Sequence, residues 1–287
     1  MTLSDLLREA TKQFETAGIP SARLDAEVLL AYCLNCDRVE FLKNPLQSLS
    51  EARVAAFQSL VERRRRLEPV AYLTGRKAFW SFTLEVNPAV LIPRPDTEVL
   101  VEEALEVCRL EAWRAPRILD IGTGSGAIAL ALASELPAAR VAAVDISEAA
   151  LVLARKNAKA LGLDRRIRFL AGNLLQPVQD ETFDIIVSNP PYIGAEEYEK
   201  LPAGVKDFEP RQALWAGKTG VEFYEKLIYQ ADAHLAQKGW LLLEIGAKQG
   251  QQVKAIMEKT GLYDRLHLRA DYAGWPRVLK GRRKKSG

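Results

Sequence analysis

The segment Asn189-Pro190-Pro191-Tyr192 follows an apolar run at residues 183–187 that is typical of a buried strand in a parallel sheet. Because the prolines cannot donate ladder hydrogen bonds, the strand must end here in a stiff loop. The side-chain carbonyl of Asn189 and the main-chain carbonyl of Pro190 are two rigidly held acceptors, which suit the two N–H donors of a planar NH2 group. Tyr192 offers an aromatic face for a planar amide or nucleobase. None of these groups is a strong base or nucleophile, so the segment predicts the orientation of a weak nitrogen nucleophile, although a simple strand-ending turn has the same pattern.

A glycine-rich loop joins a predicted strand, 118–121, to a predicted helix, 127–136. Its members are Gly122, Thr123, Gly124, Ser125 and Gly126. Missing Cβ atoms let such a loop turn sharply and approach a ligand closely. The next predicted strand, 141–144, ends in Asp145, whose carboxylate is placed to accept hydrogen bonds from ribose hydroxyls. Strand, loop, helix, strand and terminal acid together predict a nucleotide-type site.

The spacing of these glycines distinguishes between cofactors. Dinucleotide sites favour G-x-G-x-x-G with a pyrophosphate at the helix N-terminus, whereas here the third glycine comes one residue early. Asp120 stands just before the loop, where a carboxylate would repel a pyrophosphate and attract a ligand with sulfonium and ammonium charges. The pattern therefore favours S-adenosylmethionine over NAD. Asn173 follows a predicted strand at 167–170 and is placed to bind the adenine edge, with Leu174 beside the ring. The alternative is that Asn173 is only a turn residue.

The elements that must position these residues fall into three regions. Helical periodicity without a catalytic constellation in residues 1–78 predicts a small helical domain for substrate recognition. Residues 79–97 alternate around a turn at Asn87-Pro88, which predicts a β-hairpin linker. Residues 98–287 alternate strands with helices, which predicts an α/β domain with a doubly wound, Rossmann-like parallel sheet of seven strands.

The composition is that of a soluble globular protein, with 48% hydrophobic and 27% charged residues among 287. The net charge of +3 hides a basic C-terminal end without acids, formed by Arg277, Lys280, Arg282, Arg283, Lys284 and Lys285. The rest of the chain is therefore net acidic, which disfavours a general nucleic-acid binder. The basic tail itself is expected to be a solvated, disordered end.

Cysteine usage and hydropathy bear on the compartment. Three cysteines do not make a disulfide framework, which favours a reducing compartment. Cys33 and Cys36 form a lone C-x-x-C without a second pair or a nearby histidine, so no metal site is predicted. No run of 18 apolar residues predicts a membrane span, and the acids Asp5 and Glu9 are untypical of a targeting peptide. A cytoplasmic protein is expected.

The glycine loop, Asp145 and the Asn-Pro-Pro-Tyr segment occur in an order that resembles class I S-adenosylmethionine-dependent methyltransferases. In that class an Asn/Asp-Pro-Pro-Tyr/Phe loop serves the methylation of planar amide or exocyclic nitrogens. The chain is more specifically similar to the release-factor glutamine-N5 methyltransferases, the HemK/PrmC family. Further segments carry this resemblance over nearly the whole chain: Ala22–Glu27, Glu68–Gly75, Leu91–Glu98, Phe208–Pro210 and Asp271–Gly274 with Arg277. The family often has an aspartate where this chain has Asn173.

The resemblance implies methyl transfer from S-adenosylmethionine to the side-chain amide nitrogen N5 of the glutamine in the Gly-Gly-Gln motif of peptide chain release factors. It implies a catalytic loop of Asn189, Pro190, Pro191 and Tyr192. The cofactor site is expected to contain Thr97, Glu98, Asp120, Gly122, Thr123, Gly124, Ser125, Gly126, Asp145, Asn173, Leu174 and Asn189. Glu98 or Glu209 is a candidate to accept the proton after transfer. The release factor is the expected partner of a monomeric enzyme, with no membrane and no required nucleic-acid contact.

Three other functions share parts of this pattern. An adenine-N6 methyltransferase acting on DNA or RNA would use the same NH2 chemistry, but it needs a surface for base flipping. The balanced charge of residues 1–78 favours a protein partner instead. A non-catalytic binding protein would be free to lose the glycines, Asp145 and Asn189. A nicotinamide oxidoreductase is disfavoured by the glycine spacing and by the lack of an evident hydride-transfer set.

Overall fold

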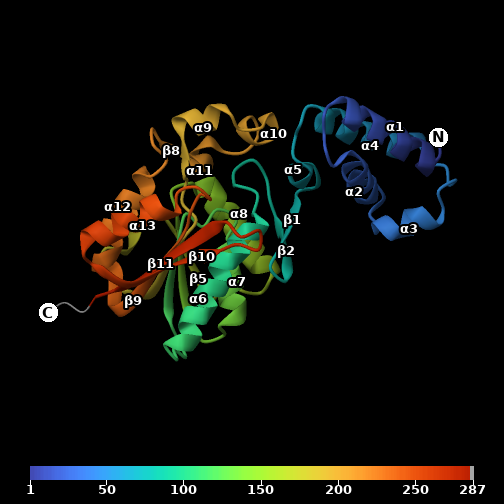
Figure 1. The fold of residues 1–287 in the computed structure, drawn as a ribbon. Coiled ribbons are helices and arrows are strands. Elements are labelled where there is room, and N and C mark those ends of the chain that lie inside the picture. Colours follow the sequence, from blue (N-terminus) through green and yellow to red (C-terminus); the bar gives the residue numbers. More distant parts are fainter. Residues whose placement is uncertain (285–287) are drawn as a thin grey trace. The chain divides into compact units, whose positions relative to one another are not determined.

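The computed structural model describes residues 1–284, apart from the side chains of residues 40–42 (Figure 1). Lys285 of the predicted basic tail lies outside the described residues. The chain divides into two compact units, residues 1–76 with 202–208 and residues 77–201 with 209–287. Each unit has its own apolar core.

The smaller unit is built from helices. They are α1 (Leu3–Thr16), α2 (Ala22–Leu34), α3 (Arg38–Lys43), α4 (Glu51–Arg65), α5 (Val70–Thr74) and α10 (Ala203–Lys206). α1 begins at a capping box, in which the Thr2 hydroxyl accepts a hydrogen bond from the Asp5 N–H at 3.2 Å. The inner faces of α1, α2 and α4 meet around Phe14, Leu29 and Phe57, which are at most 1% exposed. The helical prediction for this region is therefore confirmed.

A short hairpin, β1 (Arg76–Phe79) and β2 (Phe82–Glu85), precedes the large sheet. Its turn lies at Trp80, which has a φ of 54°, and not at the predicted Asn87-Pro88. Tertiary bonds hold it there, because the Trp80 N–H donates to Glu98 and the Asn157 side chain bonds both the N–H and the carbonyl of Glu85. These partners are distant in sequence, so alternation alone could not locate the turn.

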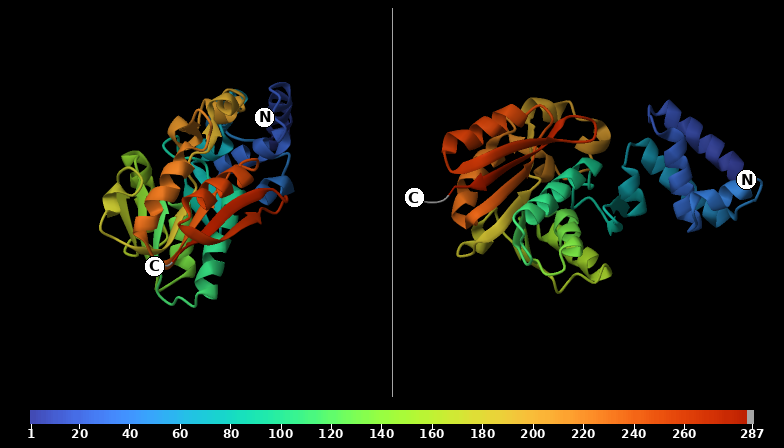
Figure 2. Two further views of the ribbon diagram at one scale, coloured as in Figure 1. Left: turned by 60° about the vertical axis from the view of Figure 1, so that its left-hand side comes forward. Right: turned by 60° about the horizontal axis from the view of Figure 1, so that its bottom comes forward.

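The larger unit contains a sheet of seven strands in the order β10-β11-β9-β6-β3-β4-β5. Figure 2 shows the strands of this unit and the helices around them in two further views. The strands are β3 (Arg117–Ile121), β4 (Arg140–Asp145), β5 (Ile167–Ala171), β6 (Phe183–Ser188), β9 (Leu235–Glu244), β10 (Tyr263–Ala270) and β11 (Pro276–Arg283). β3, β4, β5, β6 and β9 are parallel, whereas β11 runs antiparallel to both β9 and β10. The doubly wound sheet is confirmed, and its antiparallel edge follows from the short β10–β11 connection, which cannot form a crossover.

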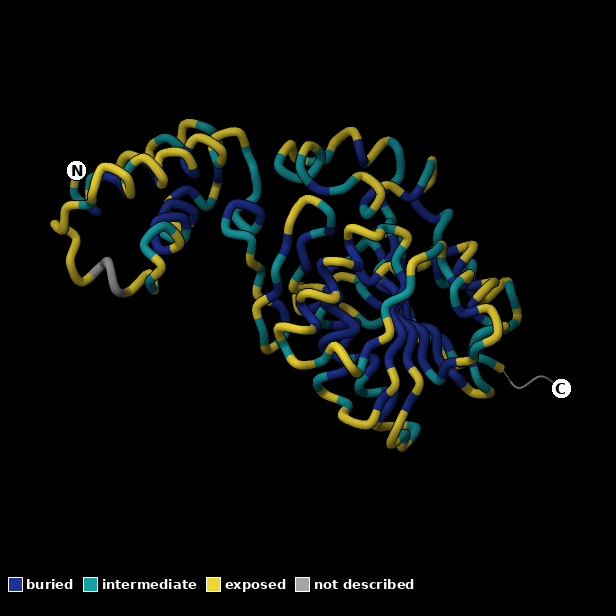
Figure 3. Tube along the Cα trace, turned by 180° about the vertical axis from the view of Figure 1, so that it is seen from behind, coloured by how far each residue is buried: buried dark blue, intermediate teal, exposed yellow. Residues whose placement is uncertain are grey.

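Helices cover both faces of this sheet (Figure 1). α6 (Glu98–Leu110), α7 (Ala127–Glu135) and α8 (Glu148–Ala160) pack on one face, and α12 (Glu222–His234) and α13 (Gly250–Thr260) on the other. Successive strand residues alternate between these layers, with Ile118 in the first and Leu119 in the second. The central strands are consequently buried along most of their length (Figure 3).

Short elements connect the larger ones around the end of β6. They are η1 (Pro95–Thr97), η2 (Gln176–Val178), β7 (Ile193–Gly194), α9 (Ala195–Glu199), α11 (Arg211–Leu214) and β8 (Trp215–Gly217). None of the described helices is long and apolar enough to cross a membrane.

The basic C-terminal end is largely part of the sheet, so the expectation of a disordered tail is wrong as far as Arg283. β11 includes Arg282, which pairs with Asp264 at 2.9 Å, and Arg283, which pairs with Asp232 at 3.0 Å. Lys280 lies 2.6 Å from Glu103. These basic residues form ion pairs with acids of neighbouring elements. The sequence pattern did not predict these pairs.

Candidate active site

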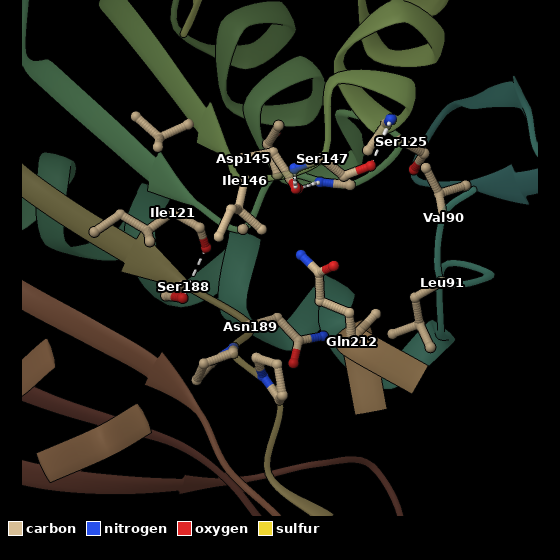
Figure 4. A pocket seen from close by; sticks show the side chains of 18 of the residues that line it. Val90, Leu91, Ile121, Ser125, Asp145, Ile146, Ser147, Ser188, Asn189 and Gln212 are labelled. Atoms are coloured by element: carbon tan, nitrogen blue, oxygen red, sulfur yellow. Dashed lines mark hydrogen bonds between the residues drawn. The ribbon is translucent and has the colours of Figure 1, made fainter. Parts of the chain in front are cut away.

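A cavity of about 270 Å³ opens at the carboxyl ends of β3, β4 and β6 (Figure 4). Predicted site residues that line it are Thr97, Gly122, Thr123, Gly124, Ser125, Asp145, Asn173, Leu174, Asn189, Pro190 and Pro191. β3 and β6 are neighbours in the sheet. From β3 the chain continues to β4 on one side, and from β6 it continues to β9 on the other side, so the strand order reverses between β3 and β6. Such a switch point is where open α/β sheets bind ligands.

The glycine loop forms one wall of the cavity. Its first N–H groups, from Gly122 and Thr123, donate to the carbonyl of Val144 at 2.8 and 3.1 Å. Gly122 and Gly124 adopt φ values of 73° and 55°, which favour glycine. A Cβ added at Gly124 would meet no protein atom within 4 Å, so the backbone there borders open space.

Asp120 lies beneath this loop and does not line the cavity. Its Oδ2 accepts from the Thr123 hydroxyl at 2.7 Å and from the Ala129 N–H at 3.2 Å, which ties the loop to α7. Its Oδ1 is buried without a hydrogen-bond partner. Burial raises the pKa of this carboxyl to about 7. In this structure the carboxylate supports the loop, and its contact with a cationic ligand stays a prediction.

Asp145 lines the cavity at the end of β4. Its Oδ2 accepts from the Gly124 N–H at 2.8 Å, and its Oδ1 accepts from the Ser147 N–H at 2.9 Å. Burial raises the pKa of Asp145, while the bonds from Ser147 and Gly124 oppose that rise. The two N–H groups fix the carboxylate plane and leave one lone pair on each oxygen for further donors.

Asn189 lies opposite the glycine loop and follows Ser188, whose hydroxyl donates to the carbonyl of Ile121 at 2.7 Å (Figure 4). That bond joins the ends of β6 and β3. The side-chain NH2 of Asn189 donates to the Thr97 hydroxyl at 3.2 Å. The amide is therefore held through its nitrogen, which leaves its oxygen available as an acceptor.

Tyr192 and Glu98 do not line the cavity. Tyr192 packs against the apolar layer of α12 and α13, and burial raises the pKa of its phenol to about 12. Its carbonyl accepts from the Gln249 side chain at 2.9 Å, which anchors the end of the Asn-Pro-Pro-Tyr loop. Glu98 accepts from the Trp80 N–H at 2.8 Å. Their assignments to the catalytic loop and the cofactor site stay predictions.

Several residues at or behind the cavity were not predicted from the sequence. Figure 4 shows the Gln212 side chain reaching into the cavity, between Asn189 and Asp145. The Gln249 side chain donates to the Tyr192 carbonyl of the Asn-Pro-Pro-Tyr loop, and the buried Glu244 lies at the end of β9. A polar residue at the carboxyl end of a buried strand was the available signal for Glu244, whereas nothing local marks either glutamine.

Glu209 is a structural anchor in this structure and lies outside the cavity lining. Its carboxylate accepts from Arg94 at 2.6 Å and from the Ile92 N–H at 3.1 Å, and it is 4% exposed. Glu209→Gln is expected to lower the free energy of unfolding by about 2 kcal/mol, because the new NH2 must face one of two donors. Chemical denaturation measures this, with faster amide hydrogen exchange expected at Ile92.

The matched control for that experiment is Glu181→Gln, which alters an exposed carboxylate paired with Arg168. Its expected cost is less than about 0.5 kcal/mol, since exposed ion pairs contribute little. Equal effects of the two substitutions would contradict the role assigned to Glu209.

Comparisons with known proteins agree with this geometry. Family models match the chain at residues 5–75, the PrmC N-terminal domain, and at residues 97–202, the methyltransferase small domain. The release factor glutamine methyltransferase of Rhodopirellula baltica is 42% identical over 281 residues, which covers 97% of this chain and 95% of the relative. That of Moorella thermoacetica is 44% identical over 279 residues, with 97% and 98% covered. The crystal structure of ribosomal protein L11 methylase from Lactobacillus delbrueckii subsp. bulgaricus has a TM-score of 0.50 at 25% identity and covers 70% of this chain and 84% of that chain.

The seven-stranded sheet and the cavity at its switch point define a methyltransferase fold. The identities of 42% and 44% to the two relatives, each over 97% of this chain, specify the family within that fold. The chain belongs to the release factor glutamine methyltransferase family.

Proposed function

We propose that this protein methylates the side-chain amide nitrogen of the glutamine in the Gly-Gly-Gln motif of peptide chain release factors, with S-adenosylmethionine as methyl donor. The observation that carries the proposal is the Asn189 amide, held by its nitrogen with its oxygen available at the cavity, in a chain of this family. A glutamine side chain ends in the planar NH2 group that such an acceptor suits.

The residues around the cavity fit S-adenosylmethionine. When bound, this cofactor supplies a methyl group on a positively charged sulfur. Gly124 presents open backbone, and Asp145 keeps acceptor capacity for ribose hydroxyls. Asn173 and Leu174, which also line the cavity, are assigned to the adenine. Asp120 lies buried beneath the loop, where its ionised form would favour a cationic ligand over a pyrophosphate.

The Asn-Pro-Pro-Tyr loop orients the substrate nitrogen that receives the methyl group. An amide nitrogen is a poor nucleophile because its lone pair is delocalised into the carbonyl. Acceptance of its N–H bonds by Asn189 and by the Pro190 carbonyl localises electron density on nitrogen and stabilises the positive charge that develops there. The remaining task is alignment with the methyl group, which is a proximity effect. The proton leaves after transfer; Glu209 and Glu98 are engaged elsewhere in this structure and carry no assignment as its acceptor.

The helical unit is assigned to recognition of the release factor, because the side chains described there form no cluster of chemistry-bearing residues at a cavity comparable to that of the larger unit. The proposed domain organisation has a helical recognition domain at residues 1–78, a hairpin linker at residues 79–97 and a methyltransferase domain at residues 98–287. A monomeric state and a cytoplasmic location accompany it as well, and size-exclusion chromatography with light scattering tests the former.

Transfer of label from S-adenosylmethionine to a purified release factor tests the function. We expect one methyl group on the glutamine of the Gly-Gly-Gln motif, located by mass spectrometry of the tryptic peptide. A release factor with that glutamine replaced by alanine is the control and should remain unlabelled. Label on DNA or RNA instead would replace the proposal by adenine methylation, and cofactor binding without transfer to any acceptor would indicate a binding protein.

A further inference from the structure

A buried carboxylate lies behind Asn189 and has no role in the reaction as described so far. Glu244, the last residue of β9, is 1% exposed, and its Oε2 has no hydrogen-bond partner. Thr97, 4% exposed, interacts with this carboxylate through its hydroxyl, which opposes the rise in the pKa of Glu244. The same Thr97 hydroxyl accepts from the Asn189 NH2 at 3.2 Å. Three side chains from separate elements thus form one continuous chain of polar contacts that ends at the cavity.

The direction of the protons in this chain follows from the chemistry of its members. An ionised carboxylate only accepts hydrogen bonds, and a threonine hydroxyl has a single proton. The Thr97 proton must therefore point to Glu244, so that Thr97 can only accept from its other neighbour. Asn189 satisfies that acceptor with its NH2, which turns its carbonyl oxygen away from Thr97.

We propose that Thr97 and Glu244 are positioning residues that fix the Asn189 amide in the one orientation in which its oxygen can accept from the methyl acceptor. The inference rests on the proposed function, in which that oxygen binds an N–H of the substrate glutamine. A flipped Asn189 would present its own NH2 to the substrate NH2, and two donors would then face each other. Neither Thr97 nor Glu244 needs to touch the substrate for this effect.

The charge of Glu244 makes the orientation dependent on pH. Burial raises the pKa of Glu244 to about 7, opposed by the Thr97 hydroxyl and by the guanidinium groups of Arg277 and Arg94, while Asp96 adds to the rise. The neutral phenols of Tyr192 and Tyr224 also lie near this carboxylate. Below that pKa the protonated carboxyl can donate to Thr97, which frees the Thr97 proton to bind the Asn189 oxygen. Activity is therefore expected to fall as pH decreases through about 7.

Two substitutions of Thr97 test the inference. Thr97→Val keeps the shape but removes the hydroxyl, and it is expected to lower kcat for release-factor methylation about 10-fold or more, less than the loss of a group that itself contacts the reacting atoms. Thr97→Ser keeps the hydroxyl and should restore most of the activity. Because Thr97 also lines the cavity, isothermal titration calorimetry with S-adenosylmethionine is run on both variants, so that a change in cofactor affinity is separated from the change in kcat. If Thr97→Val and Thr97→Ser have equal kcat values, the inference is wrong.

A double-mutant cycle separates positioning from general damage. Because Thr97 acts only through the Asn189 amide, Thr97→Val should cause no further loss of kcat in an Asn189→Ala background. An additional loss as large as in the wild-type background would mean that Thr97 contributes by another route and would overturn the inference.

Glu244→Gln tests the charge. The low-pH decrease in kcat should disappear between pH 6 and 9, whereas the melting temperature should stay the same or rise, because the substitution removes a charge that burial disfavours. Asp120 also has a pKa raised to about 7, so a pH dependence that survives Glu244→Gln belongs to another group and contradicts the inference.

A measurement without substrate distinguishes failure of this inference from failure of the proposed function. The side-chain 15N–1H signals of Asn189, assigned with Asn189→Ala, should shift with an apparent pKa near 7 in the wild type and show no such titration in Glu244→Gln. If they titrate but no release factor is methylated, the inference about orientation stands and the function fails. If methylation proceeds but the signals of wild type and Glu244→Gln behave alike, the inference fails and the function stands.

Discussion

Replacement of Asn189 by alanine is expected to lower kcat for release-factor methylation about 1000-fold, the upper range for loss of one preorganised polar group in a transition state. The Asn189 oxygen is the acceptor that the cavity offers to the substrate amide, and its nitrogen is already engaged with Thr97. Alanine removes the acceptor without adding volume. The Pro190 carbonyl remains, so the substrate can still enter, but its nitrogen loses the partner that increases its electron density.

Single-turnover transfer of label measures this loss, and calorimetry with S-adenosylmethionine measures the cofactor affinity of the same variant. The effect should fall on kcat, since the glycine loop and Asp145 remain intact. Gln179→Ala is the matched control, because it truncates an exposed amide that does not line the cavity. Wild-type kcat in Asn189→Ala would rule out the proposed orientation of the acceptor nitrogen.

Much of this site was predictable because its signals are local. The glycine loop and Asp145 lie directly after β3 and β4, and the carboxyl ends of adjacent parallel strands meet at one edge of a sheet. The prolines after β6 likewise end that strand next to β3, so Asn189 had to lie near the same edge. The alternation of strands and helices predicted the doubly wound sheet, and that prediction is confirmed.

The remainder depends on partners that are distant in sequence. Asp120 stands beside the glycine loop in the sequence, yet hydrogen bonds to Thr123 and Ala129 hold it beneath the loop. Tyr192 follows the prolines directly, but Gln249 anchors its carbonyl from 57 residues away. A side chain at such a position can point either into the cavity or away from it, and tertiary packing determines which. The same reason explains the missed Thr97–Glu244 contact, whose members belong to different elements.

Asp145→Asn is expected to raise the Kd of S-adenosylmethionine about 100-fold, which corresponds to the loss of two charge-assisted hydrogen bonds of about 1.5 kcal/mol each, in part compensated. Both oxygens of Asp145 already accept a backbone N–H, from Gly124 and from Ser147. An asparagine must direct its NH2 against one of these two donors. The substitution therefore weakens the ribose site twice, by removing acceptor capacity for the hydroxyls and by disturbing the glycine loop itself.

Calorimetry at several temperatures, with Asp180→Asn as a control at an exposed carboxylate, measures the change in affinity. Asp145→Ala makes a useful third variant, because it removes the acceptor but introduces no opposed donor at Gly124 or Ser147. If the loop disturbance contributes, asparagine should weaken binding more than alanine does, although it is closer to aspartate in shape. An unchanged Kd in both variants would show that the ribose hydroxyls find their acceptor elsewhere.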